Sequence, residues 1–159
     1  MIFLIIKVDK SSVTKDFKMK KLLVSLCFLS SSFSIAFADG HLSIAPKGAE
    51  VYFIQPVDGQ VVSSPFSVRF GLRGMGVAPA GVDKKNTGHH HLLVDLEQLP
   101  DLSKSLPASD QVKHFGGGQT EVMLSLPQGQ HSLQLLLGDH HHVPHQPPVM
   151  SEVITITVE

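Results

Sequence analysis

Histidine is the residue type in this sequence with the greatest capacity for chemistry. Most of its ten histidines fall in three clusters. Neutral imidazole nitrogens are good ligands for zinc and copper, and a nearby carboxylate or thioether can join them. We therefore predict a metal site drawn from "GHHHLL", "HFGGGQTE" and "GDHHHVPHQPPVM", with the candidate ligands His89, His91, His114, His140, His142, His145, Asp139 and Met150.

Nitrogen ligands together with methionine favour copper as the bound metal, with zinc as the second candidate. Calcium is disfavoured, because imidazole is a poor ligand for a hard cation. The prolines Pro144, Pro147 and Pro148 stiffen the last cluster and so hold its ligands in place. A hydrogen-bonded polar turn without any metal is the alternative interpretation of the same residues.

The start of the chain predicts export. Lys20 and Lys21 precede an uncharged apolar run over residues 22–35, and Ala36-Phe37-Ala38 has the small-residue spacing that signal peptidase accepts. We predict an upstream extension and a cleaved signal peptide over residues 1–38, with Met19 as the true start and the periplasm as the destination. The run is too short for a transmembrane anchor.

Cleavage after Ala38 would change the chemistry available to the protein. The only cysteine, Cys27, would be lost, so disulfides and thiolate ligands are excluded from the exported chain. The remaining 7 basic and 12 acidic side chains give a net charge of about −5, which argues against nucleic acid as a partner. A metal ion or small ligand is expected instead, and an envelope protein is a further possible partner.

A second metal site depends on the same cleavage. The new amino terminus would be Asp39-Gly40-His41, in which the amine of Asp39, two amides and the imidazole of His41 offer four nitrogens. That set suits square-planar Cu(II) or Ni(II). We predict residues 39–49 to be a flexible tail in front of the domain.

Alternating apolar and polar residues predict strands in the rest of the chain. In "FSVRFGL", Phe66, Val68, Phe70 and Leu72 share one face. Similar patterns occur at 51–54, 90–96, 121–126, 131–137 and 152–159, separated by Gly- and Pro-rich turns. Only residues 96–106 suggest helix, and Pro100 and Pro107 limit it to a turn or two. We predict a single immunoglobulin-like antiparallel β-sandwich over residues 50–159, an all-β fold with the jelly roll as the competing option.

The strand at 90–96 also divides its histidines. Because side chains alternate along a strand, His90 is expected on the core face with Leu92 and Val94. His89 and His91 are then neighbours on the opposite face, with Leu93. An H-x-H pair of this kind can chelate one ion, although Gly88 before it also fits a polar strand end.

The motifs "GHHHLLVDLEQLP", "HFGGGQTEVMLSLPQGQHSLQLLLGDHHHVPH" and "PPVMSEVITITVE" resemble the bacterial secreted family known as domain of unknown function 4399. The resemblance covers residues 51–158 and implies one compact exported domain without an established activity. The positions that match its recurring motif are His89, His90, His91, Asp95, His114, Gly116, Gly117, Gly118, Gln119, Thr120, Glu121, Asp139, His142 and His145.

Three function classes follow, in decreasing order of support. The first is an exported protein that binds a transition metal such as copper. The second is a non-metal binding or structural module of the cell envelope, in which carboxylates orient the imidazoles. The third is a copper-dependent redox enzyme, suggested by a looser similarity to copper-zinc superoxide dismutases, whose cysteines and histidine spacing are not matched here. An enzyme is therefore the less favoured interpretation, and no catalytic residue is predicted.

Overall fold

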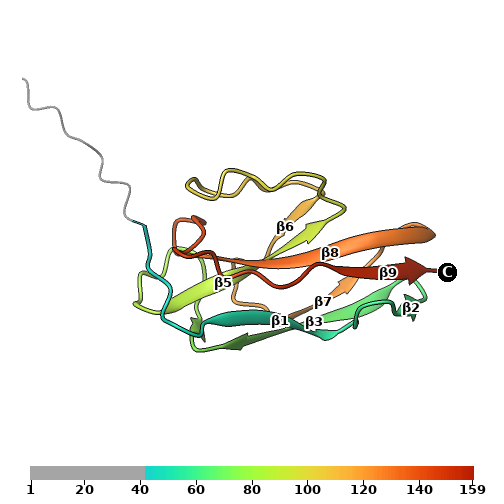
Figure 1. The fold of residues 1–159 in the computed structure, drawn as a ribbon, viewed down its shortest axis with the longest axis horizontal. Helices are drawn as coiled ribbons and strands as arrows, with labels where there is room; N and C mark the ends of the chain where they lie inside the picture. Colours follow the sequence, from blue (N-terminus) through green and yellow to red (C-terminus); the bar gives the residue numbers. More distant parts are fainter. Residues whose placement is uncertain (1–41) are drawn as a thin grey trace, which may run out of the picture. The chain divides into compact units, whose positions relative to one another are not determined.

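Two β-sheets form the fold in the computed structural model, which describes residues 42–159. The smaller sheet is antiparallel, in the order β1-β3-β7. The larger sheet has the order β2-β9-β8-β5-β4, and β6 pairs with β5 (Figure 1). The strands are β1 (Glu50–Gln55), β2 (Val61–Val62), β3 (Phe66–Arg73), β4 (Gly76–Val77), β5 (Thr87–Val94), β6 (Val112–His114), β7 (Glu121–Leu124), β8 (Gly129–Gly138) and β9 (Ile154–Val158).

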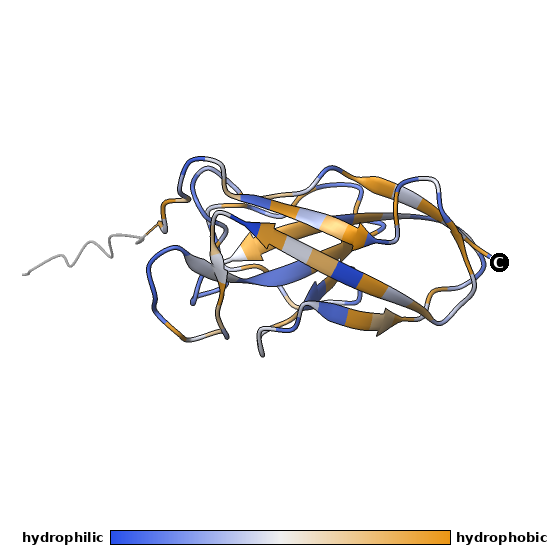
Figure 2. Ribbon diagram, turned by 90° about the horizontal axis from the view of Figure 1, so that it is seen from below, coloured by the Kyte–Doolittle hydropathy of each residue, from blue (hydrophilic) through white to orange (hydrophobic). Residues whose placement is uncertain are grey.

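The smaller sheet has one apolar face and one polar face. Phe66, Val68 and Phe70 of β3 are buried, whereas Arg69 and Arg73 are exposed, as the alternation predicted. Figure 2, which views the fold from below relative to Figure 1, shows this alternation along the nearest strands. The apolar residues meet Leu92, Leu133 and other residues of the larger sheet in the main core. Burial of this face is the main favourable contribution to the sandwich.

The larger sheet is buried on both faces at its centre. Leu92 and Val94 of β5 lie in the main core, while Leu93 points the other way into a second cluster with Leu106 and Val112. Residues 95–111, which connect β5 to β6, cover this outer face (Figure 1). The covering explains why all residues from His89 to Val94 are buried.

The predicted all-β sandwich is confirmed, because the described residues form two packed sheets and no helix. All six predicted strands are present, and β2, β4 and β6 are additional short ones. Residues 96–106 contain turns rather than the helical turn or two suggested by their pattern. Immunoglobulin-like connectivity stays a prediction.

Two further observations concern the ends of the described region. Within residues 42–159, no helix is long and apolar enough to cross a membrane. Ser43 and Ala45, in the segment predicted to be flexible, exchange backbone hydrogen bonds of 2.8 Å with Gln146. The predicted signal peptide and the Asp39–His41 site lie outside the described residues.

Candidate metal centre

Strand register brings histidines from distant parts of the chain together. His91 of β5 lies opposite His114 of β6, and His89 lies opposite Gly138 at the end of β8. The chain turns immediately after Gly138, so His142 returns to the same end of β5. We call His89, His91, His114 and His142 the histidine cluster.

The four rings of the histidine cluster are in mutual proximity. Their six centroid separations run from 4.7 Å for His114 and His142 to 6.2 Å for His91 and His142. One ligand atom from each of His89, His114 and His142 lies within 4.8 Å of the other two. Metal–nitrogen bonds of about 2.0–2.1 Å require closer spacing, so binding would draw the three rings inward by small side-chain rotations.

The inner members of the cluster have unused hydrogen-bonding capacity. His89 is 0% exposed and neither of its ring nitrogens has a hydrogen-bond partner; the same holds for Nδ1 of His91, which is 1% exposed. A buried polar group without a partner costs about 1–3 kcal/mol. His114 is exposed and His142 is partly exposed, so the cluster runs from the interior to the surface.

Burial and mutual repulsion favour the uncharged form of His89, His91 and His114. Burial lowers the pKa of His89 to about 4, assisted by His114 and His142 and opposed by the carboxylate of Asp139. Burial and the neighbouring histidines lower the pKa of His91 to about 3, and burial and His142 lower the pKa of His114. At neutral pH these imidazoles therefore have free lone pairs, which are the form that binds a metal.

Asp139 shapes the loop that carries His142. Its Oδ1 accepts hydrogen bonds from the backbone of His141 and Val143, at 2.8 and 3.0 Å, and its Oδ2 accepts one of 2.7 Å from the Ser43 hydroxyl. His142 has a φ of 66°, an uncommon conformation for a residue with a side chain. Such strain is retained where the surrounding structure enforces it, often at functional sites.

Two glycines make room for the rings. A Cβ at Gly116 would overlap Cε1 and Nε2 of His114, and a Cβ at Gly138 would lie 2.7 Å from Cε1 of His91. Both contacts are closer than a side chain allows. The glycines in "HFGGG" and "LGDHHH" are therefore part of how the cluster is positioned.

The remaining predicted ligands lie elsewhere. Nε2 of His145 donates to the carbonyl of Thr87 at 3.2 Å, and His140 lies 3.8 Å from the carboxylate of Asp83. Met150 packs in the second apolar cluster with Leu136 and Leu93. The structure thus brings together four predicted ligands, His89, His91, His114 and His142, and places Asp139 as a support for their loop.

His90 confirms the predicted division of the strand. It faces the main core on the opposite side from His89, with its ring 5.2 Å from that of Phe70. It is also 0% exposed without a partner for either nitrogen, and burial lowers its pKa to about 4. The predicted pair His89 and His91 lies on one face, as expected, but that face is buried and not a solvent-exposed strand end.

Sequence reasoning missed the supporting residues. Ser43 holds Asp139 from a segment that looked like a tail, and nothing in its local sequence indicates that contact. The backbone N–H of Leu106 donates to the carbonyl of His142 at 3.0 Å. Gly138 had a visible signal, since a glycine just before the run His140–His142 can allow a close approach to a ring.

The fold and the cluster define a small all-β protein with four imidazoles gathered at one end of a central strand. The chain belongs to the family described as "Domain of unknown function (DUF4399)", whose model matches residues 68–159. That range contains every member of the histidine cluster.

Comparisons with individual proteins add little to the family assignment. No curated protein matches the chain. Among solved structures, an endo-beta-1,4-mannanase from Thermotoga petrophila is 21% identical, with a TM-score of 0.41. The match covers 70% of this chain and 20% of that one, so the chain spans about a fifth of the length of the mannanase.

Proposed function

We propose that this protein is an exported, periplasmic metal-binding protein that holds one transition-metal ion through His89, His114 and His142, with copper as the first candidate and zinc as the second. The observation that carries the proposal is the approach of one ligand atom from each of the three imidazoles to within 4.8 Å of the other two. The proposal of export rests on the pattern of residues 19–38.

The absence of hydrogen bonds at His89 favours an ion over a purely structural role. Histidines that stabilise a polar loop have their nitrogens paired with carbonyls or carboxylates. Both nitrogens of His89 are buried and unpaired, and the rings around it are also imidazoles. A metal ion would turn this unfavourable packing into bonds, because each neutral ring has a lone pair to donate.

The type of ligand limits which metals can bind. Three imidazoles without a thiolate suit copper and zinc, and the Irving–Williams order places copper above zinc in affinity. The carboxylate of Asp139 already accepts three hydrogen bonds, and a site of imidazoles is poorly suited to a hard cation such as calcium.

The test is a titration of the exported protein with Cu(II), Cu(I) and Zn(II). His41→Ala removes the predicted site at the amino terminus and leaves the cluster intact, so binding that survives it belongs elsewhere in the chain. His114→Ala removes an exposed ligand with little risk to folding, and His141→Ala is the matched control because His141 is an exposed histidine outside the cluster.

With His41→Ala as the parent, we expect one ion per chain in the parent and after the added His141→Ala substitution, and more than about hundredfold weaker binding after the added His114→Ala substitution. Equal affinity in all three variants would overturn the assignment to the cluster. Binding that disappears with His41→Ala would reduce the metal site to the amino-terminal residues.

A further inference from the structure

A pocket opens directly beside the histidine cluster. It has a volume of about 230 Å³ and is lined by three of the clustered histidines and by the loop before β6. The lining residues are His91, His114, His142, Ser105, Leu106, Pro107 and Ala108. His89 is fully buried and does not line it, so the pocket meets the surface side of the cluster.

The loop that forms one wall of the pocket is hydrogen-bonded to the histidine cluster. The N–H of Leu106 donates to the carbonyl of His142 at 3.0 Å, and the Leu106 side chain is buried in the second apolar cluster. Reciprocal backbone hydrogen bonds between Ser109 and Val112 close the same loop. These contacts anchor the loop that forms this wall at Leu106 and at Ser109.

The ligand set leaves room for another donor. Structural metal sites are usually closed by four protein ligands, whereas sites that bind a further molecule have three and an open position. His89, His114 and His142 form the group of three. The fourth imidazole, His91, has its ring centroid 6.2 Å from that of His142; its residue lines the pocket, while its Nδ1 is buried without a hydrogen-bond partner.

We propose that this pocket binds a small molecule with a single nitrogen donor, which coordinates the metal held by His89, His114 and His142 and packs against Leu106, Pro107 and Ala108. The inference rests on the proposed function, since the metal supplies the bond. The pocket volume fits a molecule of the size of azide or imidazole, and its walls of proline, leucine and alanine favour a flat, weakly solvated frame. His91 stands beside the donor as a potential hydrogen-bonding partner.

The probe is azide, added to the Cu(II)-loaded protein with His41→Ala in place. Bound copper is measured first, by elemental analysis after dialysis. Azide bound to Cu(II) then gives a charge-transfer absorption band that reports ligand binding independently of any activity. Imidazole, added in competition, is expected to displace azide from the same position.

Ala108→Phe fills the pocket from its exposed wall without removing a histidine. We expect copper to remain bound and the dissociation constant for azide to rise by about tenfold or more. Gln98→Phe is the matched control, because Gln98 is exposed in the same connection and does not line the pocket. Its azide affinity should stay within about twofold of the parent.

The outcomes separate the two proposals. Absence of bound copper overturns the assignment of copper to the cluster, and this inference with it. Bound copper without an azide band overturns the inference alone and shows a closed site, with His91 as the natural fourth ligand. An azide band that Ala108→Phe leaves unchanged also overturns it, because the ligand would then reach the copper by another route.

Discussion

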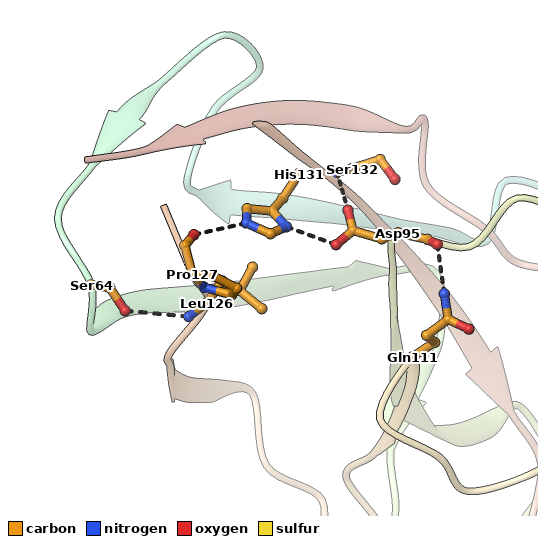
Figure 3. A network of polar contacts seen from close by, with 7 residues as sticks. All are labelled: Ser64, Asp95, Gln111, Leu126, Pro127, His131 and Ser132. Carbon is orange, nitrogen blue, oxygen red and sulfur yellow. Dashed lines mark hydrogen bonds and ion pairs between the residues drawn. The ribbon is translucent and has the colours of Figure 1, made fainter. Parts of the chain in front are cut away.

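His131, near the start of β8, and the histidine cluster around β5 differ in their hydrogen bonding and in the form of the ring that their surroundings favour. Nδ1 of His131 donates to the Asp95 carboxylate at 2.7 Å, and its Nε2 donates to the Pro127 carbonyl at 2.9 Å (Figure 3). The same carboxylate accepts the backbone N–H of Ser132 at 2.8 Å. His131 is therefore fully satisfied by the protein itself.

The histidine cluster has the opposite arrangement. Neither ring nitrogen of His89 has a hydrogen-bond partner, and its neighbouring rings are other imidazoles. Two acceptors around one ring favour the protonated form, whereas several buried rings together favour the neutral form. His131 thus stabilises a turn between strands, while the cluster keeps buried imidazole nitrogens without partners in a group that could hold a metal ion.

The largest expected effect comes from replacing the buried ligand by an apolar residue of similar size. His89→Leu should weaken metal binding by more than about hundredfold, because one of three ligands is lost. It should also stabilise the metal-free protein by about 1–3 kcal/mol, since two unpaired buried nitrogens disappear. Urea unfolding of metal-free proteins and a metal titration measure the two effects.

A metal-free His89→Leu protein that is less stable than the parent would contradict this comparison. It would mean that the imidazole makes favourable contacts in the absence of metal. His131→Leu is the matched substitution in the satisfied environment, and there we expect destabilisation, because Asp95 and the Pro127 carbonyl would lose their donor.

The second-largest effect is expected from lowering the pH, which should destabilise the folded protein through its buried histidines. Burial lowers the pKa of His89 and His90 to about 4 and that of His91 to about 3, while histidines in the unfolded chain titrate near 6.5. As pH falls below about 6.5, the unfolded chain takes up protons that the folded chain excludes. The free energy of unfolding should then fall by up to about 4 kcal/mol per pH unit for three such groups.

Urea unfolding of the metal-free protein at pH 7 and pH 5 measures this loss, in a range above most carboxylate titrations. A saturating metal should raise the free energy of unfolding at pH 7 and make its loss towards pH 5 steeper, because protons compete with the ion for the same nitrogens. A free energy of unfolding that stays constant between pH 7 and pH 5 would be inconsistent with neutral, buried histidines.

The parts of the site that sequence predicted are those set by strand alternation. The period of two placed His90 in the core with Leu92 and put His89 beside His91, because a strand allows no other assignment once Leu92 and Val94 face inward. The same rule identified β3 from Phe66, Val68 and Phe70. Long amphipathic strands are predictable because many residues report the same face.

The parts that sequence did not predict depend on short elements and on long-range contacts. β6 has three residues, too few for a pattern, yet its pairing with β5 is what places His114 opposite His91. Among the four histidines of residues 140–145, only His142 joins the cluster. That choice depends on the φ of His142, on the Val143 N–H that donates to the Asp139 carboxylate and on the Leu106 N–H that donates to the His142 carbonyl. No local pattern reveals these features.

Gly116→Ala should give a smaller effect within the cluster. The new Cβ would overlap the His114 ring, so the ring must move while the fold remains, and we expect about tenfold weaker metal binding with little change in unfolding. Gly117→Ala is the control, because its Cβ would meet only the flexible end of the Gln119 side chain. Equal affinity in the two variants would show that the position of the His114 ring does not limit binding.

The smallest effect on stability is expected from replacing His131. Its dependence on pH should have the opposite sign to that of the buried histidines. Burial lowers the pKa of His131, but hydrogen bonds to Asp95 and to the Pro127 carbonyl outweigh it and leave the pKa raised. Its contribution is therefore complete below about pH 6.5 and is lost as pH rises through the raised value. His131→Ala should cost about 1 kcal/mol at pH 5.5 and less at pH 9. An equal cost in unfolding free energy at pH 5.5 and pH 9 would mean that His131 acts by packing alone. His131 and the cluster would then differ in their contacts and not in their charge.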